Sequence, residues 1–367
     1  MRKFVQILYV LGFGLLLGVV PLTMLLFDYE QENVEYRKLA VKPVWSETTL
    51  KNWPPEYEKY FNDHFPFRDR LYRAFSRWKV DVMKESPKRK RVILGKEGWL
   101  FLSGERTLDQ YRGIDPLKAE ELDKIEQQLR EKLSWCKERG VLYGIVICPE
   151  KHSVYPDLLP DWMKTAGPMT RTNQVQERIQ KIDGLLLSDL REALRQARKE
   201  LEPLLYYKYD THWNHLGAYV GYRNMIDALT AYKDIPLRDW SDYRQLNIEK
   251  KGGDLARILN QMHWTDSVPT LEPLFEPVAG GDTAAIRYLE PTKLTFAAFE
   301  NTDSSLQHKL LIFNDSYSVS LRRYLKDSFR QSAFVWNHHF KKEMVEDLKP
   351  DIVLQEFVER YVHRVGW

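Results

Sequence analysis

The 367-residue sequence has few cysteines, little net charge and no glycine-rich phosphate-binding motif. Its two cysteines, Cys136 and Cys148, provide no disulfide framework, and their spacing does not decide whether they pair. The formal net charge is +3 and the basic residues are spread out apart from one run at 84–91, which is interpreted as a solvated loop or as a contact with anionic lipid or an acidic polymer, so nothing marks a nucleic-acid-binding surface. Because P-loop and dinucleotide motifs are also absent, we expect no nucleotide cofactor.

The usual pattern of a metal site is absent as well. His212 and His215 are three residues apart, and His338 and His339 are adjacent, but no suitably spaced Cys, Asp or Glu completes a set of zinc ligands. We therefore expect no metal centre.

One long hydrophobic run lies at the N-terminus. Residues 4–27 carry no charge, and at about 1.5 Å per helical residue they could cross a bilayer. Arg2 and Lys3 precede the run and acidic residues follow it, which places the rest of the chain outside the cytoplasm by the positive-inside rule. A cleaved signal peptide is the alternative, although the run is long for one and no small-x-small site ends it. The sequence predicts a transmembrane anchor over 1–27 and a juxtamembrane linker over 28–54.

Residues 55–367 are expected to form one α/β domain. Residues 116–139 have strong helical periodicity, and the continuous apolar run 141–148 is typical of a strand covered on both faces. A helix followed by such a strand predicts a doubly wound, mostly parallel sheet. Further strands are predicted at 204–207, 309–313, 333–336 and 351–354, and further helices at 171–200 (interrupted near 183–184), 216–229, 318–329 and 341–348.

The segment 235–302 has weak patterning and many turns, including 251–255 and 280–282. We interpret it as an insertion or a lid.

A serine, a histidine and an aspartate occupy positions from which they could form a catalytic triad. Asp210 lies two residues before His212, after one predicted strand, and Ser316 follows another. Because the C-terminal ends of parallel strands meet at one edge of a sheet, these side chains are expected to come together. A serine hydroxyl needs a base to remove its proton, and a carboxylate orients that base. Ser316 alone could be a helix cap, so the joint placement of the three residues carries the prediction.

Four stretches resemble a known family. They are Gly95-Lys96-Glu97-Gly98-Trp99-Leu100-Phe101, Asp210-Thr211-His212-Trp213, Asn314-Asp315-Ser316-Tyr317 and Pro350–Arg360. Together they resemble the AlgJ/AlgX group of SGNH-hydrolase-like proteins, which O-acetylate bacterial exopolysaccharides such as alginate outside the inner membrane. The resemblance spans about residues 55–367. It implies an SGNH-hydrolase-like fold with the circularly permuted order Asp, His, Ser.

The resemblance assigns the triad roles to Ser316, His212 and Asp210. The family usually has Gly-Asp-Ser-Phe at the serine turn, so Asn314 and Tyr317 are departures. Asn tolerates a left-handed backbone better than most residues, so we expect the turn to survive. The candidates to line a substrate cleft are Lys151, Tyr155, Trp213 and Tyr317, and core packing is the alternative for Tyr155 and Trp213.

The expected function is O-acetyl transfer to a polysaccharide through an acyl-enzyme. Since no acetyl-CoA is found outside the cell, the resemblance implies a membrane-bound O-acyltransferase partner that supplies acyl groups. The chain resembles the single-domain AlgJ type more than AlgX, which has a further carbohydrate-binding module. An O-acetylesterase with the same triad and a non-catalytic polymer-binding subunit of an export complex remain the alternatives.

Overall fold

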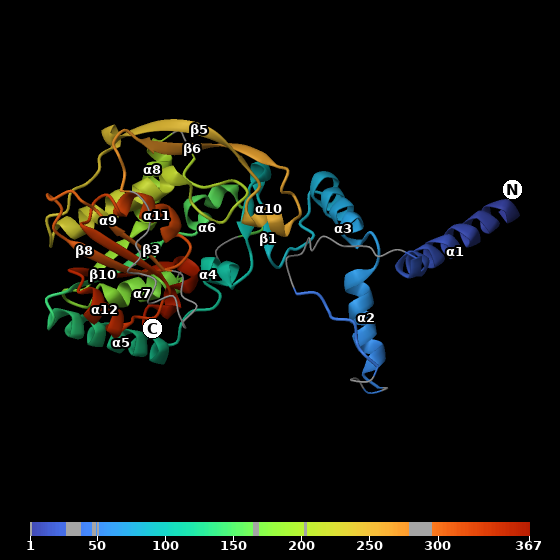
Figure 1. The fold of residues 1–367 in the computed structure, drawn as a ribbon, viewed down its shortest axis with the longest axis horizontal. Helices are drawn as coiled ribbons and strands as arrows, with labels where there is room; N and C mark the ends of the chain where they lie inside the picture. The colour runs from blue at the N-terminus through green and yellow to red at the C-terminus, as the bar shows by residue number, and fades with distance from the viewer. Residues whose placement is uncertain are drawn as a thin grey trace. The chain divides into compact units, whose positions relative to one another are not determined.

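The computed structural model describes residues 2–26, 38–45, 49, 51–163, 169–201, 204–278 and 296–367 (Figure 1). The chain divides into two compact units, one of Met1–Pro87 with Ile258–Gln261 and the other of Lys88–Arg257 with Met262–Trp367. The domain predicted to begin at residue 55 therefore contains parts of both units. Most of the predicted linker 28–54 lies outside the described residues.

The first unit is helical. Its elements are α1 (Arg2–Leu26), α2 (Trp53–His64), α3 (Arg68–Arg77) and a π-helical turn at Trp78–Val82. Helix α2 begins with prolines in its first turn, where a missing N–H removes no intrahelical hydrogen bond.

Helix α1 forms over the apolar run that the sequence analysis interpreted as an anchor. A membrane span needs both length and sustained apolar character, and none of the helices described here combines the two sufficiently. The predicted transmembrane helix is therefore not supported.

The second unit is built on a six-stranded sheet. All neighbouring strands run parallel except the edge strand β7, which is antiparallel to β9. The predicted mostly parallel sheet is thus confirmed. In spatial order the strands are β4 (Leu186–Asp189), β3 (Leu142–Cys148), β10 (Ile352–Val358), β8 (Lys309–Asn314), β9 (Gln331–Trp336) and β7 (Phe296–Glu300).

Helices cover both faces of this sheet, which explains why its strands are continuously apolar (Figure 1). Successive side chains of β8 point to opposite faces: Leu310 and Ile312 belong to one core cluster, and Leu311 and Phe313 to the other. The first cluster includes side chains of α8 (Leu190–Glu200), α9 (His215–Thr230) and α11 (Ser318–Leu325); the second includes side chains of α5 (Ala119–Lys137), α7 (Arg171–Ile179) and α12 (Lys342–Leu348).

Two antiparallel pairs lie outside the main sheet. Strands β1 (Val92–Leu94) and β2 (Leu100–Leu102) form one pair, and β5 (Tyr243–Lys251) and β6 (Thr265–Pro273) form the long ribbon at the top of Figure 1. This ribbon occupies much of the weakly patterned segment 235–302, of which 279–295 lie outside the described residues. The short helices are α4 (Thr107–Arg112), α6 (Lys151–Val154), α10 (Asp254–Ile258), and the 3-10 turns Lys96–Gly98, Pro156–Leu158, Trp240–Asp242 and Glu359–Arg364.

Two sequence predictions about the sheet were wrong. Residues 204–207 do not join it, since this stretch makes only an isolated bridge between Tyr206 and Trp213. The helical region 171–200 is instead divided into α7 and α8 by strand β4. This strand has only four residues, too few for its alternation to stand out from the flanking helices.

Removing a core side chain from the second unit should destabilise it. Leu129 of α5 is fully buried, so Leu129→Ala is expected to lower the free energy of unfolding by about 2–5 kcal/mol, measured by denaturant titration. Gln127→Ala on the exposed side of the same helix is the matched control, with a change within about 0.5 kcal/mol. Equal effects of the two substitutions would contradict the described packing of α5.

Candidate active site

The structure brings Ser316, His212 and Asp210 into one hydrogen-bonded chain. The Oγ atom of Ser316 lies 2.7 Å from His212 Nε2, and His212 Nδ1 lies 2.6 Å from Asp210 Oδ1. The His212 backbone N–H also donates to Asp210 Oδ1 at 3.1 Å, which fixes the carboxylate relative to its own loop. The predicted juxtaposition is therefore present, with the geometry needed to pass a proton from the serine to the imidazole.

Ser316 stands in the turn between β8 and α11, at the C-terminal edge of the sheet. The buried carboxylate of Asp315 holds this turn: its Oδ1 accepts the Tyr317 N–H at 3.0 Å, and its Oδ2 accepts the Val358 N–H at 2.9 Å. His338 Nε2 lies 3.3 Å from the same Oδ2. The end of β10 thus fixes the turn, and Ser316 is its half-buried member.

The departure from glycine at Asn314 has a simple structural explanation. Asn314 is the last residue of β8, paired with Trp336, and it is not among the described non-glycine residues with positive φ. The turn therefore survives, as expected, but it does not need the left-handed backbone on which the prediction relied.

Two aromatic residues tie the histidine loop to the serine turn. Trp213 Nε1 donates to the Tyr317 carbonyl at 3.1 Å, and Tyr317 Oη donates to the Thr211 carbonyl at 3.0 Å. Both rings are fully buried. They are therefore not available to line a substrate cleft, and the prediction that they do so is wrong.

Lys151 and Tyr155 are corrected in the same way, because both are buried. Lys151 Nζ donates to the carbonyls of Leu100 at 2.9 Å and Lys208 at 3.3 Å, and Tyr155 Oη accepts the Leu205 N–H at 2.9 Å. These bonds support the chain segment that leads to the histidine loop. Burial lowers the pKa of Lys151 to about 7, although Asp210 acts in the opposite direction.

The environment of His212 favours its protonated form. Burial alone would lower the pKa of His212, but the hydrogen bond and charge of Asp210 more than compensate and raise it. Burial likewise opposes ionisation of Asp210, yet the His212 contact holds the pKa of that carboxyl well below its usual range. The pair is thus arranged to stabilise a positive imidazolium beside a negative carboxylate.

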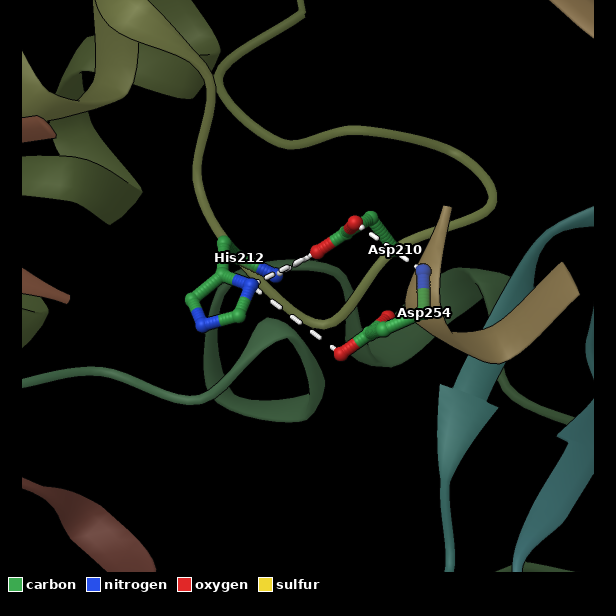
Figure 2. A group of neighbouring side chains, drawn as sticks. All are labelled: Asp210, His212 and Asp254. Atoms are coloured by element: carbon green, nitrogen blue, oxygen red, sulfur yellow. Dashed lines mark hydrogen bonds and ion pairs between the residues drawn. The ribbon is translucent and has the colours of Figure 1, made fainter. Parts of the chain in front are cut away.

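A second carboxylate at this site, Asp254 at the start of α10, was not predicted from the sequence (Figure 2). Asp254 Oδ2 lies 4.0 Å from His212 Nδ1, and the Asp254 N–H donates to Asp210 Oδ2 at 3.1 Å. The available sequence signal was the Gly252-Gly253-Asp254 turn, but nothing in the sequence connects it with Asp210.

Ligand atoms of Asp210, His212 and Asp254 lie within 4.8 Å of one another, close enough to hold a metal ion. However, His212 Nδ1 already contacts Asp210 and Nε2 contacts Ser316. A metal ion would have to displace one of these partners, so the side chains fit a proton relay better than a metal centre. His215 points elsewhere, with Nδ1 2.5 Å from Thr270 Oγ1.

Charged groups are also buried at the ends of β3 and β10. Arg360 Nη1 donates to Glu150 Oε1 at 2.5 Å and Arg360 Nε donates to Glu105 Oε2 at 2.9 Å. Glu359 Oε2 accepts the Glu150 N–H at 2.7 Å. Pairing of these charges makes their burial tolerable and joins the two strand ends next to the triad.

Comparison with known proteins agrees with the geometry. Residues 92–285 match the family described as an SGNH hydrolase-like domain of acetyltransferase AlgX. The chain belongs to this AlgX-type acetyltransferase family. Membership confirms the resemblance based on the sequence motifs, and with it the enzyme class.

The solved structures to which this chain is similar are distant from it in sequence. Bacillus cereus PatB1 is 16% identical with a TM-score of 0.54, covering 74% of this chain and 96% of that one. A DHHW family protein from Eubacterium siraeum is 17% identical with a TM-score of 0.51, covering 75% and 93%. The O-acetyltransferase domain of Pseudomonas putida AlgJ is 18% identical with a TM-score of 0.47, covering 74% and 92%. At such identities PatB1 and the DHHW protein support the fold alone, and no curated protein matches.

The coupling between His212 and Asp210 can be measured directly. An NMR titration of the His212 ring should give a pKa above its ordinary value of 6.5, and Asp210→Asn should lower that pKa by about one unit or more. His215 is an internal control, because burial and the charge of Arg323 hold its pKa at about 4. A wild-type His212 pKa at or below 6.5 would contradict the described pairing.

Proposed function

We propose that this chain transfers acetyl groups to hydroxyls of a polysaccharide through an acyl-enzyme on Ser316. The observation that carries the proposal is the Ser316–His212–Asp210 relay in a chain of the AlgX-type family. The members of the AlgJ/AlgX group act outside the inner membrane, and we propose the same compartment here.

In the first half-reaction, Ser316 Oγ attacks the carbonyl carbon of an acetyl donor while its proton moves to His212 Nε2. The donor oxygen leaves with that proton, and the acetyl group remains as an ester on Ser316. Asp210 stabilises the imidazolium that forms in between. The Ser316 backbone N–H is the proposed donor to the oxyanion, since it lies in the turn that starts α11.

In the second half-reaction, a sugar hydroxyl attacks the ester and gives its proton to His212 Nε2. Ser316 Oγ leaves and recovers that proton, so the enzyme returns to its starting state. The donor is proposed to come from a membrane-bound O-acyltransferase partner, because no acetyl-CoA pool exists outside the cell.

Hydrolysis by the same relay is the second candidate, with water in place of the sugar. About a quarter of the His212 side chain is exposed (26%), so solvent can reach the base. Whether the enzyme transfers or hydrolyses depends on how well a bound acceptor excludes water. A non-catalytic role in an export complex is disfavoured because the relay is complete.

The full-length protein should release acetate from a chromogenic acetyl ester, and Ser316→Ala should reduce kcat/KM by about 10⁴-fold or more. Ser320→Ala, in the first turn of the same helix, is the matched control and should retain full activity. Activity unchanged by Ser316→Ala would exclude the proposed nucleophile.

Adding acetylated and unacetylated oligosaccharides separates the two reactions. A transferase should form acetylated oligosaccharide, detected by mass spectrometry, and should turn over the ester faster when an acceptor is present. Acetate release that is indifferent to every acceptor, without acetylated product, would favour the esterase.

A further inference from the structure

The segment Gly252-Gly253-Asp254 makes a close backbone contact with the histidine loop. A Cβ atom at Gly253 would lie 2.3 Å from the Tyr209 carbonyl oxygen and 3.0 Å from Asp210 Cβ, and Gly253 has a φ of 155°. Only glycine allows this approach without displacement of one segment. The Ala256 N–H also donates to the Tyr209 carbonyl at 3.1 Å, so the first turn of α10 is fixed to the same loop.

Asp254 bonds to the loop through both its backbone and its side chain. Its N–H donates to Asp210 Oδ2, the oxygen that does not face His212 Nδ1. In the other direction, Asp254 Oδ1 accepts the Thr211 N–H at 2.7 Å and Oδ2 accepts Thr211 Oγ1 at 2.5 Å. Thr211 Oγ1 is itself 3.2 Å from His212 Nδ1. Asp254 is thus bonded directly to Asp210, and it is linked to His212 through Thr211.

The Asp254 carboxylate also adds a second negative charge near the imidazole. Figure 2 shows the Asp210 and Asp254 carboxylates on the same side of the ring, both facing His212 Nδ1, and Asp254 Oδ2 lies 4.0 Å from that nitrogen. An attraction at this distance is substantial in a partly buried site. The negative charge of Asp254 therefore favours the imidazolium form of His212, which exists while Nε2 holds the proton taken from Ser316.

We infer that Asp254 is a positioning residue of the catalytic unit, which fixes the Asp210 carboxylate and adds charge that stabilises protonated His212. The inference rests on the proposed function, because it assigns Asp254 to the same proton relay. No additional covalent step is involved: the proton still moves between Ser316 Oγ and His212 Nε2.

Several charged groups act on this unit and define its titration. Asp210 and Asp254 raise the pKa of His212, whereas burial, the largest influence, and the charge of Arg360 lower it. Burial and the charge of Asp210 raise the pKa of Asp254. Two further cations, Lys250 on β5 and Lys151 on α6, interact with the Asp210 and Asp254 carboxylates.

The charge can be removed while most hydrogen bonds are kept. In Asp254→Asn, the amide oxygen can still accept the Thr211 N–H and the amide nitrogen can donate to Thr211 Oγ1. We expect the acid limb of the kcat/KM–pH profile for the acetyl ester to move down by about half a unit or more, because neutral His212 then persists to lower pH. At the plateau, kcat should fall by about tenfold, because the imidazolium loses a stabilising charge.

One control isolates the Asp254 charge from a general change of surface charge. Glu249→Gln removes an exposed carboxylate from β5 and should leave the whole profile unchanged. Thermal unfolding of each variant shows whether it is folded, and Asp254→Ser, a neutral residue that can still cap α10, replaces the Asn variant if that one is not.

The outcomes separate the inference from the proposed function. Wild-type activity abolished by Ser316→Ala, together with a downward-shifted acid limb in the neutral Asp254 variant, supports both. If Ser316→Ala is inactive but the folded neutral variant has the wild-type acid limb, Asp254 is only structural and this inference is overturned. If Ser316→Ala is as active as wild type, the proposed function itself fails.

Discussion

The candidate site depends on a reciprocal pair of hydrogen bonds between two segments about a hundred residues apart. The Trp213 indole donates to the backbone of the serine turn, and the Tyr317 hydroxyl donates to the backbone of the histidine loop. Both side chains are fully buried, so neither bond competes with water. Trp213 immediately follows His212, Thr211 precedes it, and Tyr317 immediately follows Ser316. Small displacements of either segment would therefore separate Ser316 from His212.

Two buried acidic residues at the C-terminal edge of the sheet, Asp315 and Glu356, also hold the turn that carries Ser316. Asp315 accepts backbone N–H groups from its own turn and from the end of β10, while Glu356 accepts the Asp315 N–H and the Ser318 hydroxyl, each at 3.0 Å. Burial and the neighbouring Asp315 raise the pKa of Glu356 well above its usual range. Burial opposes ionisation of Asp315 as well, but its contacts with His338 and with backbone N–H groups lower its pKa, so the two neighbouring carboxyls are shifted in opposite directions.

The elements predictable from sequence were those whose burial leaves a periodic pattern. Continuous apolar runs gave β3 and β8 correctly, because helices cover both sheet faces there, and the position of Ser316 followed from the end of β8. The ribbon β5–β6 was missed because most of β5 is exposed and has no buried face to impose alternation. Asp254 was missed for a different reason: its contacts with Asp210 and Thr211 arise only from tertiary structure.

Aromatic residues near the motifs were the least predictable. A tryptophan or tyrosine has the same local signature in a core as in a carbohydrate cleft, and only the three-dimensional packing distinguishes them. Trp213, Tyr317 and Tyr155 all proved to be core residues. Their hydrogen bonds fix the histidine loop and the serine turn, and under the proposed function contact with an acceptor would come from side chains at the surface of the site.

The serine turn is held in place by residues other than the serine itself. Asn314, Asp315, Tyr317 and Ser318 are all buried, whereas Ser316 is only half-buried and is described with a single side-chain partner, His212. The scaffold of the turn and its reactive atom are therefore set by different residues. Under the proposed function, a substitution at Ser316 would remove the nucleophile while leaving the buried contacts of the turn in place.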